Sequence, residues 1–425
     1  MTRDQCVLLV FLAAFFTGCS PDADRPTKTA PKAQVIRLEP GPNAQDETQT
    51  ALIKAKPGDT IEFAAGTFDF TLELSLAVEG VTVRGQGIDK TTLSFKKQNA
   101  GSAGLLVTRG KFVLEDLSVD DAKGDAVKVN GADGVTLRRV RARWTGGSKP
   151  TNGAYGLYPV QCSNVLIEEC VASGASDAGI YVGQSQNIIV RRCRAEGNVA
   201  GIEIENSSDA DVYDNVTTDN AGGLLVFDLP GLEVKNGRRV RVFHNQVVAN
   251  NHENFAAKGN TVATVARGTG IVVMATDQVE VFENTIKDNN SYSMAISSYY
   301  ILGKPWTDKE YDPIPEGIYI HDNKISGGGT KPSGEAAALA SLLGKPMPDI
   351  VFDGMRNSAK FVNGVEPPEL RVYVKDNGPA TFANVHFDKM DAKDPAGSVA
   401  RVERNLQPYE GELPRLPQVH LPGVP

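Results

Sequence analysis

The chain has 425 residues, of which 41% are hydrophobic and 23% charged, a composition typical of globular proteins with one or two domains. Its 52 acidic and 44 basic residues give a net charge of -8, which argues against a nucleic-acid-binding surface, since such a surface needs clustered positive charge. The 42 glycines and 7% aromatic residues indicate many tight turns and a core of small aliphatic side chains.

The first nineteen residues are typical of an export signal. Arg3 precedes the apolar run 7–16, which has the length of a signal-peptide core and is too short to cross a bilayer as a helix. Thr17-Gly18-Cys19 follows, and these residues resemble a bacterial lipoprotein signal, from which Asp4 and Phe16 depart. The resemblance implies lipidation of Cys19 as the mature N-terminus. An ordinary secretory signal cut nearby is the alternative.

We therefore expect a protein of the cell envelope, attached to a membrane through Cys19. Ser20 after the cysteine implies, by the same resemblance, an outer membrane lipoprotein that faces the periplasm or the cell surface. Residues 20–33 contain three prolines and mixed charge, which predicts a flexible tether after the signal 1–19. No later apolar segment has the length needed to cross a membrane.

A repeat of about 22 residues organises the following chain. Its strands alternate apolar and polar residues over only three to six positions, too few for a strand to bury its own inner face. They must stack on their copies, so residues 34–325 are predicted to form an all-β, right-handed, single-stranded parallel β-helix. The leucine-rich repeat is the rival at this period, but its spaced leucines and its helix are missing. The repeated units begin at Gly156, Gly179, Gly201 and Gly223.

The last residues of the second strand of each unit should form one interior column. Asparagine amides in such a column hydrogen-bond from coil to coil, and cysteines act as small buried hydrophobes, so we predict that Cys170 and Cys193 are neighbouring buried thiols. The residues just before them should form surface salt bridges, and we assign structural roles to His244 and His321. The interior column comprises Val140, Cys170, Cys193, Asn215, Asn245, Asn284 and Asn323.

The two ends of the repeat region differ from its middle. An amphipathic stretch, 48–56, predicts a small helix that covers the open N-terminal end of the stack. Long loops are predicted at 251–268, 299–315 and 327–348, the last with a helix near 335–343, and insertions of this kind often carry a binding surface. Residues 326–425 should therefore hold a loop insertion, the last strands and a C-terminal tail.

Several segments of the repeat resemble the parallel β-helix repeat family of exported bacterial proteins, which is related in architecture to pectate lyases and alginate epimerases. The resemblance covers about residues 34–325 and implies an exported diheme cytochrome c as a partner. The Asp-Pro-His-Asp motif of epimerases, the paired aspartates of polygalacturonases and the arginine motif of pectate lyases are absent from the sequence. The segments that carry the resemblance are 155–160, 177–185, 198–206, 222–230 and 250–255.

Alternation within the repeat places one set of polar and aromatic residues on a single outward face. Tyrosines beside carboxylates resemble a sugar-binding floor, and polar groups at the coil edge would bond hydroxyls or help to hold calcium. We expect these residues to line an open groove. The alternative is an ordinary solvated surface. The candidate ligand-binding residues are Lys128, Tyr158, Tyr181, Gln184, Glu203, Glu205, Asn206 and Asp228.

Two classes of function fit this face. The first is a non-catalytic envelope protein that binds a glycan or docks another exported protein. The alternative is a calcium-assisted polysaccharide lyase or epimerase acting on uronate polymers, with Tyr158, Tyr181 and Glu203 as catalytic candidates and Glu203, Glu205 and Asp228 as calcium ligands. Lys128 is the one cationic residue expected on this face, which weighs against the enzyme. Five histidines and six methionines scattered along the chain do not favour metal delivery.

Overall fold

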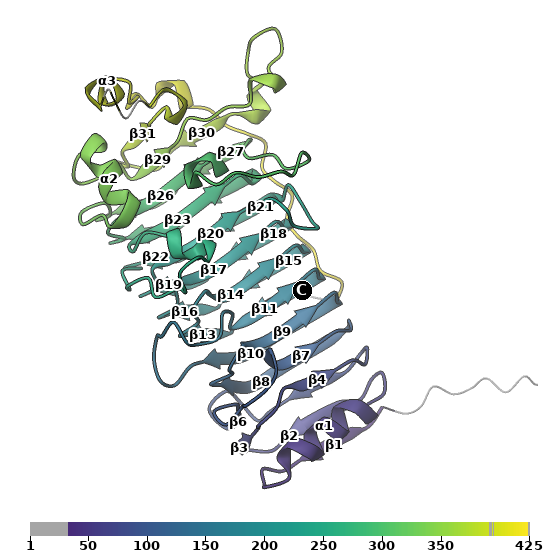
Figure 1. Ribbon diagram of the computed structural model, residues 1–425. Coiled ribbons are helices and arrows are strands. Elements are labelled where there is room, and N and C mark those ends of the chain that lie inside the picture. Colours follow the sequence, from purple (N-terminus) through teal and green to yellow (C-terminus); the bar gives the residue numbers. More distant parts are fainter. Residues whose placement is uncertain (1–32, 391–392, 394, 424–425) are drawn as a thin grey trace, which may run out of the picture. The chain divides into compact units, whose positions relative to one another are not determined.

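The computed structural model describes residues 33–390, 393 and 395–423. The predicted signal 1–19, the lipidation site Cys19 and the tether up to residue 32 lie outside the described residues. The described strands pair in parallel and wind into a right-handed β-helix, which confirms the predicted fold class (Figure 1). Among the residues that the structure describes, no helix has the length and apolar character required to cross a membrane.

The strands form three columns, which are the three faces of the β-helix. The first face contains β1 (Val35–Leu38), β2 (Thr60–Phe63), β5 (Thr82–Arg84), β8 (Phe112–Asp120), β10 (Asp133–Arg143), β12 (Ser163–Glu168), β15 (Gln186–Arg191), β18 (Ser208–Tyr213), β21 (Arg238–Phe243), β24 (Asp277–Phe282), β27 (Ile318–His321) and β30 (Val372–Lys375). The long strands β8 and β10 continue around a corner into the second face.

The second face is built from shorter strands. It contains β3 (Gly66–Asp69), β6 (Thr91–Ser94), β13 (Val171–Ser173), β16 (Arg194–Glu196), β19 (Val216–Thr218), β22 (Gln246–Val248), β25 (Thr285–Lys287) and β28 (Lys324–Ser326).

The third face is a separate sheet of eleven strands. It contains β4 (Leu74–Leu76), β7 (Ala103–Val107), β9 (Asp125–Asn130), β11 (Leu157–Val160), β14 (Ala178–Gly183), β17 (Ala200–Glu205), β20 (Gly222–Phe227), β23 (Thr269–Met274), β26 (Tyr292–Ser297), β29 (Ile350–Phe352) and β31 (Phe382–Asn384). The stack thus extends past residue 325 into the region where the last strands were expected.

Helices occur at the ends of the stack and in the loops. They are α1 (Ala44–Lys54), α2 (Gly334–Leu343), α3 (Pro395–Ala400) and the short 3-10 helices η1 (Thr261–Thr264), η2 (Tyr299–Leu302), η3 (Ser358–Lys360), η4 (Pro368–Leu370), η5 (Phe387–Lys389) and η6 (Gln407–Tyr409).

The core is formed by the inward-facing residues of successive coils. In one coil, Ile180 and Val182 of β14 and Ile188 and Val190 of β15 all have no exposed surface. Each such side chain stabilises the fold by roughly 1.5–3 kcal/mol through its burial, and the burial requires the coils above and below. A single coil has no core of its own.

Each coil turns from the first to the second face at a residue with left-handed backbone geometry. Its φ angle lies between 50° and 55° in eight coils, and strain of this kind costs roughly 1–3 kcal/mol for a residue other than glycine. All of these residues except Asp376 belong to the predicted surface column, whose side chains form ion pairs such as Arg192 with Glu169 at 3.1 Å and His244 with Glu283 at 2.5 Å. The corner residues are Arg139, Glu169, Arg192, Asp214, His244, Glu283, Asp322 and Asp376.

The predicted interior column follows these corners and forms an asparagine ladder. The side-chain nitrogen of Asn215 donates to the side-chain oxygen of Asn245 at 3.0 Å, and the same bond runs from Asn245 to Asn284 at 3.0 Å and from Asn284 to Asn323 at 2.9 Å. Asn377 extends the ladder by one more coil. The ladder fixes the strained corners in one register.

Cys170 and Cys193 occupy the same column in the preceding coils. Both are buried free thiols, as predicted, and their sulfurs donate to backbone carbonyls. Burial raises the pKa of Cys170 well above its ordinary value, which keeps it as a thiol.

A second asparagine ladder was not predicted. Asn198 donates to Asn220 at 3.0 Å, Asn220 to Asn250 at 2.9 Å and Asn250 to Asn289 at 3.2 Å. Each member stands five residues after a member of the first column, at the corner between the second and third faces. That constant offset is a sequence signal that could have revealed it.

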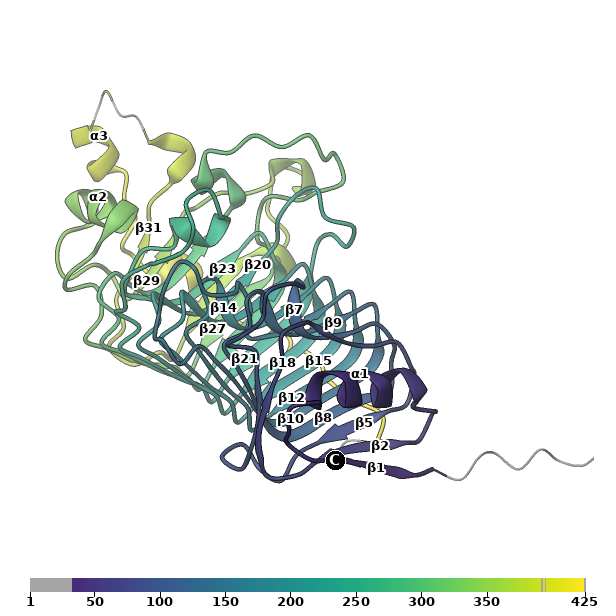
Figure 2. The same ribbon diagram turned by 60° about the horizontal axis from the view of Figure 1, so that its bottom comes forward.

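The N-terminal end of the stack is covered by α1 (Figure 2). The Gln49 side chain donates to the Ser75 carbonyl and accepts from the Ser75 N–H, both at 2.9 Å, which satisfies the open edge of β4. Gln45 accepts the N–H groups of Thr71 and Leu72 in the same way. The helix begins at Ala44, four residues before its predicted start.

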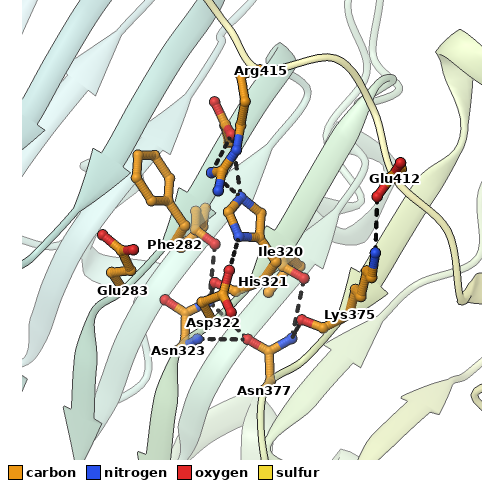
Figure 3. Close-up of polar contacts among 12 residues, drawn as sticks. Phe282, Glu283, Ile320, His321, Asp322, Asn323, Lys375, Asn377, Glu412 and Arg415 are labelled. Atoms are coloured by element: carbon orange, nitrogen blue, oxygen red, sulfur yellow. Dashed lines mark hydrogen bonds and ion pairs between the residues drawn. The ribbon is translucent and has the colours of Figure 1, made fainter.

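The C-terminal tail, 410–423, returns along the first face toward the N-terminal coils. The Leu416 N–H donates to Glu280 of β24 at 3.1 Å, and the Val419 N–H donates to Asp211 of β18 at 3.2 Å. Figure 3 shows Arg415 of the tail beside His321, whose ring lies 3.2 Å from Glu280. Burial raises the pKa of Glu280, but bonds from His321 and Arg415 outweigh it and hold the pKa below its ordinary value. His321 thus belongs to a structural network.

Replacing one ladder residue should destabilise the whole solenoid. Asn245→Ala removes the acceptor of the Asn215 backbone and side-chain N–H groups and the side-chain donor to Val212 and Asn284, so we expect a loss of about 2 kcal/mol or more and a lower thermal midpoint by circular dichroism. Asn99→Ala, at an exposed position, is the control and should change the midpoint little. Equal midpoints for Asn245→Ala and the wild type would show that the ladder contributes no stability.

Candidate functional site

The candidate site lies on the outer side of the third face. The strand register aligns one outward residue from each coil into a column whose chemistry changes along the stack. It begins with a cation and two tyrosines, passes through a carboxyl group and continues with aliphatic side chains. We call this the central column: Lys128, Tyr158, Tyr181, Glu203, Leu225, Val272, Ala295 and Val351.

The three predicted loops lie over this face and carry η1, η2 and α2, the last within one residue of its predicted start. Figure 2 shows loops projecting from the side of β20 and β23. Together with the sheet they border a partly open cavity of about 480 Å³. Glu203, Leu225, Val272 and Ala295 form its floor, and Val262, Val265, Ile301 and Leu339 of the loops contribute to its walls.

A cluster of tyrosines and carboxyl groups lies at one end of the cavity. The rings of Tyr155, Tyr158 and Tyr181 are mutually packed, with centroids 4.4–4.9 Å apart. The Tyr181 hydroxyl donates to Glu205, and the Tyr155 hydroxyl lies 3.5 Å from Asp177. We call these five residues together with Glu203 the tyrosine–carboxyl cluster: Tyr155, Tyr158, Asp177, Tyr181, Glu203 and Glu205.

Burial governs the electrostatics of this cluster. It raises the pKa of Asp177 to about 7 and that of Glu205 to about 6, and it holds the pKa of Glu203 well above its ordinary value, with further contributions from neighbouring carboxylates at Asp177 and Glu203. Burial also raises the pKa of Tyr158 to about 12 and that of Tyr181 further. Asp177 and Glu205 are therefore poised to ionise near neutral pH.

Glu203 is the least satisfied member of the cluster. Its side chain is 2% exposed and lines the cavity, yet its Oε1 atom has no hydrogen-bond partner among the described residues. A buried acceptor without a donor costs free energy unless a ligand or a water molecule donates a hydrogen bond to it.

The structure corrects the expectation of an open groove. Tyr158, Tyr181, Glu203 and Glu205 do lie together with Lys128, whose Nζ atom is 4.8 Å from the Tyr158 ring centre. However, the insertions cover this face, so that Tyr181, Glu203 and Glu205 are buried. Neither an open groove nor a solvated surface describes the site.

Three candidate ligand-binding residues are engaged elsewhere. Gln184 accepts the N–H of Glu233 at 3.1 Å, and Asn206 exchanges hydrogen bonds with Leu229, so both hold the loop after β20. Asp228 is fully buried and accepts from the Gly237 N–H and the Thr276 hydroxyl. These side chains organise the backbone and do not line the cavity.

The predicted calcium ligands do not form a metal site. Among the described residues, no group of three or more histidine, cysteine, aspartate or glutamate side chains is arranged to hold a metal ion. Glu205 accepts a hydrogen bond from Tyr181, and the two Asp228 oxygens accept hydrogen bonds from Gly237 and Thr276.

Two members of the cluster were missed by the sequence analysis. Tyr155 and Asp177 stand 22 residues apart. Tyr155 lies two positions before β11, and Asp177 lies one position before β14. Their neighbouring places in the register, one position apart at the start of successive strands, were a signal that could have been found. The wall residues of the loops gave no such signal because the loops do not repeat.

Comparisons with known proteins agree with the fold. Residues 103–265 match a family model described as the right handed beta helix region. No curated protein matches the chain in sequence. Similar solved structures include the A-module of mannuronan C-5 epimerase AlgE4 from Azotobacter vinelandii, with 16% identity, 68% of this chain and 85% of that chain covered, and a TM-score of 0.46.

Two further solved structures are similar to the chain, also with low sequence identity. The polygalacturonase from Erwinia carotovora ssp. carotovora has 12% identity, with 85% of this chain and 98% of that chain covered and a TM-score of 0.45. Pectate lyase Pel9A has 13% identity, with 79% and 88% covered and a TM-score of 0.38. The strand pairing, together with the family match over residues 103–265, makes the chain a right-handed parallel β-helix protein. The region matched by the family model contains the whole tyrosine–carboxyl cluster.

The buried carboxyl groups should make stability depend on pH. Asp177, Glu203 and Glu205 stay protonated in the folded protein at pH values where they ionise in the unfolded chain, so they cost stability as pH rises from about 4 toward 7, by about 1.4 kcal/mol for each unit of raised pKa. Glu203→Gln removes one such group, so its thermal midpoint relative to wild type should be higher at about pH 8 than at about pH 5.

Glu39→Gln is the matched control, because that side chain is exposed near the N-terminal end of the stack, outside the cavity. Its midpoint relative to wild type should change far less between the two pH values. A Glu203→Gln difference that is the same at both pH values would mean that Glu203 does not titrate as described.

Proposed function

We propose that the chain is a non-catalytic binding protein of the cell envelope that holds a compact ligand with an apolar body in the cavity of the third face. The observation that carries this proposal is a cavity of about 480 Å³ that is bordered by three insertions which the β-helix itself does not require. Cavities of this size that combine apolar walls with a few polar groups are typical of small-molecule sites.

A linear glycan is the second candidate. The hydroxyl group of Tyr155 and the carboxyl group of Asp177 at one end of the cavity favour it, since they can bond sugar hydroxyls. The helices η1, η2 and α2 lie over the cavity, which favours a compact ligand instead, because an extended polymer needs a groove that is open at both ends.

The enzyme alternative has less support. A lyase or epimerase must neutralise a uronate carboxylate before it removes the adjacent proton, and the described cavity lining contains no lysine, arginine or histidine. Burial and the nearby Glu205 raise the pKa of Tyr181 far above neutrality, so its hydroxyl stays protonated and is not available as a base. Acidic side chains in the lining would also repel a uronate polymer.

The envelope location is part of the same proposal. It is supported by the apolar run 7–16 and by Thr17-Gly18-Cys19, which predict a lipid anchor at Cys19. Docking of an exported partner such as a diheme cytochrome c also stays a proposal, for which the projecting loops offer a surface.

Binding to the cavity can be tested with an uncharged fluorescent probe. N-phenyl-1-naphthylamine should bind the wild-type protein with an increase in emission. Ala295→Trp places an indole in the cavity floor and should weaken binding at least tenfold, whereas Ala338→Trp, on the exposed side of α2, should leave it unchanged. Absence of probe binding to the wild type, or equal binding to both variants, would contradict a ligand cavity.

Turnover of uronate polymers is not expected. Alginate and pectate, each with and without calcium, should give no new double-bond absorbance and no epimerisation by NMR. A product that disappears in both Glu203→Gln and Tyr181→Phe, while Glu283→Gln keeps it, would establish the enzyme instead.

A further inference from the structure

We infer that the ligand of the cavity is an organic cation, an ammonium group carried on an apolar body. This inference rests on the proposed function and names the class of ligand. It follows from the charge of the lining, from the unpartnered oxygen of Glu203 and from the aromatic groups beside it.

The ionisable carboxyl groups that line the cavity have no cationic counterpart among the described lining residues. Asp177, Glu203, Glu205, Glu335 and Asp353 line the cavity, and the described lining includes no cationic side chain. Asp353 is already engaged, since it accepts from the Ser298 N–H and hydroxyl at 2.6 Å. The unmatched acidic groups are therefore concentrated in the tyrosine–carboxyl cluster, where an anion would be repelled and a cation attracted.

Glu203 supplies the most specific contact. The residue lines the cavity, and its Oε1 atom is buried and lacks a donor among the described residues. An ammonium N–H would complete this acceptor with a charge-assisted hydrogen bond, which is stronger than a bond between neutral groups. Glu205 and Asp177 lie close enough to Glu203 to influence its pKa, so the same cation would relieve repulsion among the three carboxyl groups.

The aromatic groups favour a cation as well. The Lys128 Nζ atom lies 4.8 Å from the Tyr158 ring centre, which places a cation–π contact on the edge of the cluster within the protein itself. Tyr155 also lines the cavity and would offer an aromatic contact to a ligand ammonium group.

The remaining lining determines what the ammonium group is attached to. Beyond Glu203 the floor consists of Leu225, Val272 and Ala295, and Met274 and Ile296 lie beside them. A bare metal ion would leave these surfaces without a partner, and no metal-binding group of side chains exists among the described residues. An amine with an aliphatic or aromatic body satisfies both ends of the cavity.

Three indoles of similar size test the charge of the ligand: tryptamine, which is a cation, tryptophol, which is neutral, and indole-3-propionate, which is an anion. Isothermal titration calorimetry of the full chain at about pH 7.5 should give an affinity for tryptamine at least tenfold above that for tryptophol, and no binding of indole-3-propionate.

Glu203→Gln should reduce the preference for tryptamine over tryptophol about tenfold. Binding of N-phenyl-1-naphthylamine should be retained, which shows that the variant is folded and that its cavity is intact. Glu283→Gln, at an exposed corner, should behave as wild type.

The outcomes separate the two proposals. Equal or tighter binding of tryptophol, tighter binding of indole-3-propionate, or no binding of any indole by a protein that binds N-phenyl-1-naphthylamine would overturn the cation inference and leave the proposed function in place. Failure of N-phenyl-1-naphthylamine itself to bind would overturn the proposed function.

Discussion

The in-register stacking of short strands is the constraint on which the rest of the structure depends. A strand such as β16 has three residues, and one coil buries little apolar surface on its own. Stability comes from the repetition of equivalent positions, with Ile180 over Ile202 and Val182 over Ile204. The same register brings each asparagine into contact with the next, so the ladders and the core depend on one alignment.

The register also produces the site. Because alternate residues of the third face point outward, the central column collects residues that are about 22 positions or more apart in the sequence. The regular coils supply the tyrosine–carboxyl cluster, and the insertions bury it. The cover raises the pKa of Asp177 and Glu203 through desolvation, which converts a row of surface side chains into a buried acidic site.

The sequence predicted what the repeat encodes. Equivalent residues at regular intervals predicted the repeat period, the fold class and the first asparagine column. They also predicted the buried Cys170 and Cys193 and the positions of the loops. The cover could not be predicted, because the contacts of Val262 and Leu339 with the third face are long-range and occur once. The prediction of an open groove was therefore wrong. Asp228 was predicted to bind a ligand, but it accepts a hydrogen bond from the Gly237 N–H.

The most direct measurement is the number of protons released when a cation binds. Asp177, Glu203 and Glu205 are flanked by three tyrosines, with Lys128 and Asp125 at the edge of the cluster, and a bound ammonium group should shift these carboxyl groups toward ionisation. Tryptamine titrations at about pH 6.5, in two buffers of different ionisation enthalpy, yield this number. The account predicts a net release of protons that is reduced in Glu203→Gln. Zero release or net uptake would contradict it.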